Sequence, residues 1–525
     1  MKPSKTDRKK AARAAAVVDI GSNLLRMRIC QQKQGEIWEL EYLEYPISIG
    51  HEVFTSGKIS FESIRAISSA LQSFFDLARE YGAEICRVVT TTALREAENR
   101  AFVVDQLRIQ NGIQVEILED NQEKAYIYGE MMDRLKDEPE QSCSMFSFIG
   151  TGSIGLAVLY GKTIVFSRNI AIGALKLRDV LGSLQSFTTE FHTALEEYLQ
   201  ATIGKRLAVF PAGKPEIGRL ALAGNDIPLI AQLCGAREEN GRYLIKTHSL
   251  KELYRKICNL TPAKISLHYH ITELQAELLY TALSIYVYLA DFSGVKEIIA
   301  PNADLIQPIM KEVLLPKSKA QRSEKQRADA LGCARLLAAT FRCSQPHSEK
   351  VAAAAEKIFD KMKKFHGLGS SKRFLLELAA ILHECGYYIH PKLYSMGIFQ
   401  LLKNMDLYGV AEEELETLAA VFLSLEEELS PGAAGRPQKL VVSKLSAIFR
   451  LADALDYSQK QKLENLKVRL DKNRLVLSVE SLEDAALEQW AFRQAVPFFE
   501  DVFGVRPELI IRPAAAANAL ELGKV

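Results

Sequence analysis

The sequence of 525 residues lacks an excess of either charge, a regular cysteine spacing and a long apolar run. Lys and Arg number 66 against 65 Asp and Glu, so the formal net charge of +1 creates no overall field for nucleic acid or an anionic membrane. The eight cysteines show neither close metal-ligand spacing nor a disulfide framework. Without a signal-peptide pattern or an apolar span of membrane length, we expect a reduced, cytoplasmic protein. We expect no membrane association and no specific nucleic-acid binding, so any polyanion site must be a local patch.

A chain of this length exceeds what one hydrophobic core can organise, so about two to four domains are expected. Residues 1–14 are basic and lack an apolar stretch. They fit a solvated tail better than a nucleic-acid arm.

Strand-like and helix-like segments alternate from residue 15 onward. Residues 15–30 read as two strands joined by the polar turn DIGSN at 19–23. A second glycine turn, GTGS at 150–153, also lies between two strand-like segments. The alternation predicts an α/β fold with mixed sheets, and the repeated turn indicates a duplicated fold with a cleft between its halves.

The character of the chain changes at about residue 318, after which helix follows helix. Residues 466–480 then read as a hairpin, followed by a helix and a strand. The predicted parts are a basic tail (1–14), two α/β subdomains (15–135 and 136–317), a helical domain (318–460) and a small α/β C-terminal domain (461–525).

The two glycine turns can present backbone N–H groups to a phosphate, and each carries a hydroxyl that can donate to a phosphate oxygen. A glycine turn between strands is usually only a turn, so each one alone is weak evidence. The prediction of phosphate binding therefore depends on the presence of both turns in this order.

Together with further motifs, these turns resemble the exopolyphosphatase and guanosine pentaphosphate phosphohydrolase family. The residues that match the motifs of that family are Asp19, Gly21, Ser22 and Asn23, then Thr91, Leu94, Arg95, Ala97 and Asn99, then Glu116, Ile117 and Leu118, then Ile149, Gly150, Gly152 and Ser153. The resemblance continues to the C-terminus through LAAILHECGYYIH, FRLADALDYS and FFEDVFG. It implies a duplicated actin-like (ribonuclease H-like) phosphatase fold, an all-α domain of the histidine–aspartate (HD) type and a small α/β cap.

The resemblance implies hydrolysis of terminal phosphoanhydride bonds of polyphosphate or guanosine pentaphosphate, assisted by Mg²⁺. Asp19 is then a metal ligand and Arg95 a phosphate clamp. The phosphate-binding residues implied are Gly21, Ser22, Asn23, Gly150, Gly152 and Ser153. A homodimer is implied as well.

Several acids of the family pattern are replaced. Gln122 stands where the general base is expected, and glutamine can orient a water but cannot take its proton. A one-residue shift would let Glu123 serve. Phe148 and Gly155 replace an aspartate and a glutamate of the second turn, and neither side chain offers oxygen to magnesium. Two functions therefore stay open: a weakened phosphoanhydride hydrolase, or a non-catalytic regulatory homologue that binds polyphosphate or nucleotide.

In the helical domain, His347, His383, Glu384 and Asp453 stand in the order of the HD-type metal ligands. Glutamate in place of aspartate keeps a carboxylate but lengthens it by one methylene. Further histidines of that pattern are missing. We therefore expect these positions to serve packing and hydrogen bonding more readily than metal binding.

Overall fold

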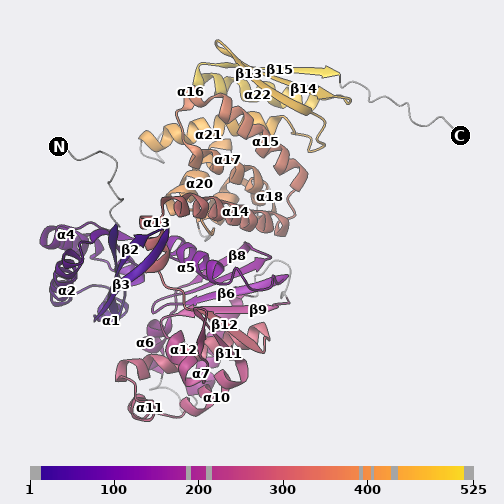
Figure 1. The fold of residues 1–525 in the computed structure, drawn as a ribbon. Coiled ribbons are helices and arrows are strands. Elements are labelled where there is room, and N and C mark those ends of the chain that lie inside the picture. Colours follow the sequence, from indigo (N-terminus) through magenta and orange to yellow (C-terminus); the bar gives the residue numbers. More distant parts are fainter. Residues whose placement is uncertain are drawn as a thin grey trace, which may run out of the picture. The chain divides into compact units, whose positions relative to one another are not determined.

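The computed structural model describes residues 13–184, 191–207, 216–389, 394–403, 407–426 and 436–513 (Figure 1). The chain forms two compact units, 1–329 and 330–525, whose boundary falls inside helix α14 (Pro316–Thr340). The predicted basic tail lies almost wholly outside the described residues. None of the helices in the described ranges combines the length and apolar character needed to cross a bilayer.

The first sheet of unit 1 has the order β3-β2-β1-β4-β5 among the described residues. Strands β1, β2 and β3 are antiparallel neighbours, whereas β1, β4 and β5 run parallel, so the sheet is mixed as predicted. Its strands are β1 (Ala14–Ile20), β2 (Leu24–Lys33), β3 (Glu36–Pro46), β4 (Glu84–Thr90) and β5 (Val115–Ile117). The helices that follow them are α1 (Ile49–Ser56), α2 (Phe61–Glu80), α3 (Thr92–Glu96), α4 (Arg100–Asn111) and α5 (Asp120–Arg134).

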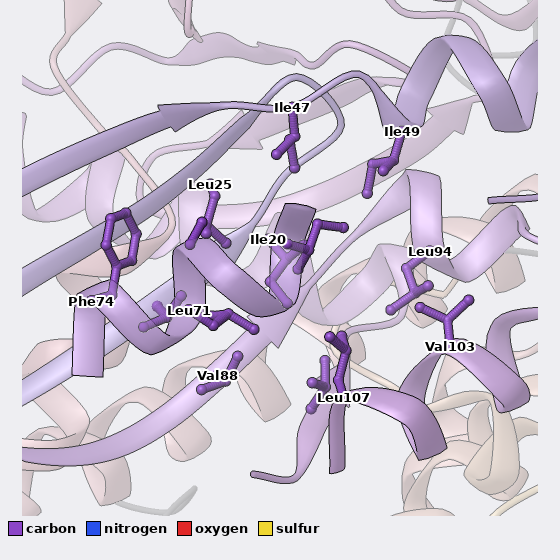
Figure 2. Close-up of a cluster of buried hydrophobic side chains, with 14 of the residues drawn as sticks. Ile20, Leu25, Ile47, Ile49, Leu71, Phe74, Val88, Leu94, Val103 and Leu107 are labelled. Carbon is purple, nitrogen blue, oxygen red and sulfur yellow. The ribbon is translucent and has the colours of Figure 1, made fainter. Parts of the chain in front are cut away.

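Strand β1 is buried on both faces, because its side chains alternate between two hydrophobic cores. Ile20 belongs to the core built with α2 and α4, where Figure 2 shows it near Leu71 and Leu94. Val17 belongs to the core on the other face, together with Ile309 of α13 (Ile306–Leu314). The sheet is therefore the middle layer between helices, and β1 is held rigidly up to the turn that follows it.

The second sheet of unit 1 has the order β10-β11-β12-β9-β6-β7-β8 in the described part of the chain. Its strands are β6 (Cys143–Ile149), β7 (Ile154–Tyr160), β8 (Thr163–Ile170), β9 (Arg219–Gly224), β10 (Glu238–Glu239), β11 (Arg242–Lys246) and β12 (Glu297–Pro301). The associated helices are α6 (Ala174–Leu184), α7 (Phe191–Leu199), the π-helix η1 (Gln200–Gly204), α8 (Lys205–Leu207), α9 (Ile227–Leu233), α10 (Thr247–Ile257), α11 (Pro262–Tyr269) and α12 (Glu273–Ser293). Strand β6 is antiparallel to β7 and parallel to β9, which repeats the pairing of β1 with β2 and β4.

Unit 2 begins with packed helices. These are the remainder of α14, α15 (Gln345–Lys361), α16 (Lys363–His366), α17 (Ser370–Leu382), α18 (Cys385–Ile389), α19 (Tyr394–Lys403), α20 (Glu412–Glu426) and α21 (Arg436–Ala454). Helix α21 packs against α15, α17 and α20. The chain continues into β13 (Glu464–Asp471), β14 (Arg474–Ser481), α22 (Ala486–Phe503) and β15 (Arg506–Pro513), which form a sheet of order β13-β14-β15 with α22 against β15.

Candidate functional site

The two glycine turns of unit 1 are built alike. Ile20 pairs with Leu25 and Ile149 with Ile154, so residues 21–24 (turn 1, which ends on the first residue of β2) and residues 150–153 (turn 2) both span four residues between paired positions. In each turn the N–H of the glycine donates to the carbonyl of the fourth residue, at 3.0 Å in turn 1 and 2.9 Å in turn 2. The predicted duplication of the turn is therefore confirmed at the level of hydrogen bonds.

The start of a helix holds each turn from behind. The N–H of Gly50 in α1 donates to the carbonyl of Ser22 at 2.9 Å, and the N–H of Leu175 in α6 donates to Thr151 at 3.0 Å. These helices also meet, because a Cβ on Gly50 would lie 2.8 Å from Cδ2 of Leu175. A Cβ on Gly152 would lie 2.6 Å from Cγ2 of Thr92, which belongs to the half of unit 1 that carries turn 1. The two turns therefore border one site.

Four polar side chains beside turn 1 end in buried atoms without a hydrogen-bond partner among the described residues. The atoms are Oδ1 of Asp19, Oγ of Ser22, Nδ2 of Asn23 and Oε2 of Glu123. A buried polar atom left unpaired costs about 1 to 3 kcal/mol, so such atoms are rarely concentrated in one place without a ligand. This cluster of donors and acceptors marks the candidate site.

Burial raises the pKa of Asp19 to about 7, against the influence of the nearby Arg26 guanidinium, and the charges of Glu123 and Asp304 raise it further. A carboxyl that titrates near neutrality inside a polar cluster is typical of a functional site.

Gln122 and Glu123 are neighbours in helix α5, but their side chains point in different directions. Gln122 is exposed, and its Oε1 accepts from the N–H of Glu119 at 3.0 Å, which closes a capping box at the start of the helix. Glu123 is buried, and its charge acts on Asp19. Because neighbouring helical side chains point about 100° apart, only one of the two can face the site. The structure brings the carboxylate of Glu123 there and leaves the amide of Gln122 outside.

Arg95 is engaged with the start of α5. Its guanidinium forms an ion pair with Asp120, lies 3.6 Å from Oε2 of Glu123, and donates to the carbonyl of Leu118. It also donates to the hydroxyl of Thr92 at 3.1 Å. Arg95 therefore positions the carboxylate of Glu123, while its predicted role as a phosphate clamp stays a prediction.

A lysine that the sequence motifs do not single out lies at turn 2. Lys124 is only 2% exposed, and its Nζ donates to the hydroxyl of Ser153 at 3.1 Å. The same Nζ lies 5.1 Å from the centre of the Phe148 ring. The lysine directly after Glu123 is visible in the sequence, but its burial and its partners are not.

In unit 2, three of the predicted metal residues converge. Nε2 of His347 lies 3.2 Å from Nε2 of His383 and 3.4 Å from Oδ1 of Asp453, and His383 lies 3.7 Å from the same oxygen. These three ligand atoms all lie within 4.8 Å of one another. Glu384 is turned elsewhere, because its Oε2 accepts from the N–H of Ser344 at 2.9 Å.

The second ring nitrogen of each histidine in this triad, Nδ1, lies within hydrogen-bond distance of an oxygen atom. Nδ1 of His347 lies 2.9 Å from Oδ2 of Asp456, and Nδ1 of His383 lies 2.9 Å from the carbonyl of Ala380. Metal-binding histidines are commonly oriented in this way. Burial disfavours a charge on His347, but its hydrogen bonds with Asp453 and Asp456 raise its pKa to about 9.

Comparison with known proteins decides the family. The model of the Ppx/GppA phosphatase family matches residues 29–291, and the model of Ppx/GppA phosphatase domain III matches residues 332–495. The chain belongs to the Ppx/GppA phosphatase family. This confirms the resemblance inferred from the motifs.

Individual relatives of this Ppx/GppA chain are distant. The guanosine-5'-triphosphate,3'-diphosphate pyrophosphatase of Vibrio atlanticus is 21% identical over 475 residues, which are 88% of this chain and 91% of the relative. That of Photobacterium profundum is 19% identical over 91% of this chain and 95% of its own. The crystal structure of an exopolyphosphatase from Cytophaga hutchinsonii is 16% identical, with a TM-score of 0.51 over 57% of this chain and 98% of that chain. This last likeness shows the fold alone, with its mixed α/β sheets.

The Mg²⁺ implied by the Ppx/GppA family does not fit turn 2 of this chain. Mg²⁺ takes oxygen ligands, and the side chains of Phe148 and Gly155 supply none. The ammonium of Lys124 lies at the same turn and would repel a cation. Among the described residues, the unpaired buried carboxylate oxygens of this cluster lie on the side of turn 1, on Asp19 and Glu123.

Proposed function

We propose that the site between turns 1 and 2 binds the terminal phosphates of polyphosphate or guanosine pentaphosphate and hydrolyses the terminal phosphoanhydride bond at a reduced rate. The observation that carries this proposal is the cluster of unpaired buried atoms on Asp19, Ser22, Asn23 and Glu123. The names of the curated relatives support the substrate class, since both are guanosine-5'-triphosphate,3'-diphosphate pyrophosphatases.

Three of these four side chains act directly in this reaction. The hydroxyl of Ser22 and the amide of Asn23 donate to oxygens of the terminal phosphoryl group. The carboxylate of Glu123 accepts a proton from the attacking water, whose oxygen forms a bond to the terminal phosphorus. The bond from that phosphorus to the bridging oxygen breaks, and the leaving phosphate keeps the electron pair.

We expect a reduced rate because the site has fewer groups that can stabilise negative charge through a metal ion. Catalysis of phosphoryl transfer is mostly positioning and stabilisation of negative charge. Phe148 and Gly155 contribute no metal ligand at turn 2, so stabilisation by a metal ion is weakened there.

The test is phosphate release from long-chain polyphosphate and from guanosine pentaphosphate, beside a binding titration of the same ligands. We expect slow turnover that Glu123→Gln lowers strongly and Gln122→Ala leaves intact. Binding without turnover in any divalent metal would favour the non-catalytic regulatory homologue instead. No binding of either ligand would refute the proposal.

The triad in unit 2 supports a second function. We propose that the helical part of unit 2 is an HD-type domain in which His347, His383 and Asp453 bind one divalent transition metal. Imidazole nitrogens and a carboxylate suit Zn²⁺ or Fe²⁺, and three protein ligands leave coordination positions open. A homodimer formed through this unit belongs to the same proposal, and the mass of the full chain in solution tests it.

A further inference from the structure

Lys124 is a buried cation with few partners. Lysine is almost never fully buried unless it is paired, yet Lys124 is 2% exposed. No carboxylate of the described residues lies within ion-pair distance of its Nζ, and its neighbour Glu123 faces Arg95 instead. An ammonium has three N–H donors, and only the hydroxyl of Ser153 accepts from it in the part of the chain that the structure describes.

The space for Lys124 is made by Gly155. A Cβ on Gly155 would lie 2.5 Å from the hydroxyl oxygen of Tyr128 and 2.6 Å from both Cδ and Cε of Lys124, so a side chain at this position would force the lysine to shift. Gly155 lies opposite Phe148 in the pairing of β6 with β7. The glycine admits the aliphatic stem of the lysine, and the aromatic ring attracts its ammonium.

These three residues therefore form one arrangement. Phe148 and Gly155 are the positions at which the family resemblance places two acids, and both now accommodate a cation. A lysine ammonium is a compact point charge that can bind phosphate without a metal ion. Its position at Ser153 directs it to turn 2, one of the two turns to which we assign phosphate.

We propose that Lys124 binds an anionic oxygen of the phosphate ligand at turn 2 and supplies the positive charge there in place of a divalent cation, so that polyphosphate binding does not require a metal. This inference rests on the proposed binding of phosphate between the turns. A lysine that merely filled the core would leave anion binding indifferent to its charge.

The test is calorimetric titration of the full chain with inorganic tripolyphosphate, once in excess EDTA and once with Mg²⁺. We expect wild-type Kd values of the same order in both. In EDTA, Lys124→Met is expected to weaken binding about ten- to hundredfold, because a hydrogen bond to a charged group is worth roughly 1.5 to 3 kcal/mol. The matched control is Lys136→Met, which alters an exposed lysine just beyond the end of α5.

Gly155→Ala provides a second variant in case Lys124→Met does not fold. Its Cβ would force the stem of the lysine to shift, so weaker binding in EDTA is expected as well. Wild-type binding that requires Mg²⁺ would overturn the inference and leave the proposed function standing. Equal binding by Lys124→Met and wild type in EDTA would overturn it as well. Failure to bind in both conditions would overturn the inference and the proposed function together.

Discussion

The carboxylate of Glu123 lies 3.6 Å from the guanidinium of Arg95, measured from Oε2 to Nη1. The same guanidinium holds Asp120, so one arginine fixes two carboxylates at the start of α5. The preceding residue, Gln122, points outward and caps the helix. A carboxylate therefore stands beside Asp19, although a gap-free match to the family motif puts a glutamine at that position.

We expect Glu123→Gln to lower the rate of phosphate release about 10² to 10⁴-fold, the usual contribution of a general base. Binding of tripolyphosphate should change little, because the amide keeps the shape of the side chain. Steady-state phosphate release and calorimetry check the two expectations. The neighbouring Gln122→Ala is the control, since it removes only a helix cap. A larger loss of turnover in Gln122→Ala than in Glu123→Gln would contradict this assignment.

We expect Asp19 to make the protein less stable as the pH rises. Burial raises its pKa from 3.8 to about 7, so the folded chain keeps a proton that the unfolded chain releases. The free energy of unfolding should therefore fall by about 3 to 4 kcal/mol between about pH 4 and pH 8 through this residue.

Chemical denaturation of wild type and Asp19→Asn across that range isolates the effect, because other titrating groups cancel in the difference. The variant should show a flatter dependence on pH. Parallel curves would show that Asp19 titrates normally in the folded state.

Gly173→Ala should distort turn 2, because its Cβ would contact the carbonyl oxygen of Gly150 and the carbonyl carbon of Thr151. We expect weaker tripolyphosphate binding by about tenfold or more, as the loss of one charged hydrogen bond would give. Gly129→Ala is the matched control, since its Cβ would meet no atom closer than 3.9 Å. In that control the gain in helix propensity is worth up to about 1 kcal/mol in thermal unfolding. Unchanged binding in Gly173→Ala would remove turn 2 from the site.

The triad of unit 2 should bind Co²⁺ or Zn²⁺ in the full chain. His383→Ala is expected to abolish binding, and Asp456→Asn to weaken it about 10- to 100-fold through the orientation of His347. Glu384→Ala should leave it unchanged, because that carboxylate is occupied by Ser344. Metal analysis after dialysis, with Co²⁺ absorption as a second readout, distinguishes these cases. A strong effect of Glu384→Ala alone would indicate a different ligand set.

Much of the fold follows from local patterns. Alternating apolar segments around residues 19–23 and 150–153 predicted the two mixed sheets, because strand and helix periodicities are local properties of the chain. The equal length of the two turns was not readable, because it follows from the pairing of Ile20 with Leu25 and of Ile149 with Ile154. The order of His347, His383 and Asp453 matched that of HD-type ligands, but the sequence favoured packing over metal binding, because their convergence depends on how α15, α17 and α21 pack.

The sequence by itself determined the family, the two turns and the order of the helical and sheet-forming segments, because each depends on neighbouring residues. Only the tertiary structure decided that Glu123 faces Asp19, since a shift of one helical residue rotates a side chain by about 100° and sequence matching cannot fix that shift. It also decided that Lys124 enters the space left by Gly155, a contact between α5 and β7. From the sequence, the replacement of two acids by Phe148 and Gly155 indicates only the loss of metal ligands. The structure shows that these two residues pack against the side chain of Lys124.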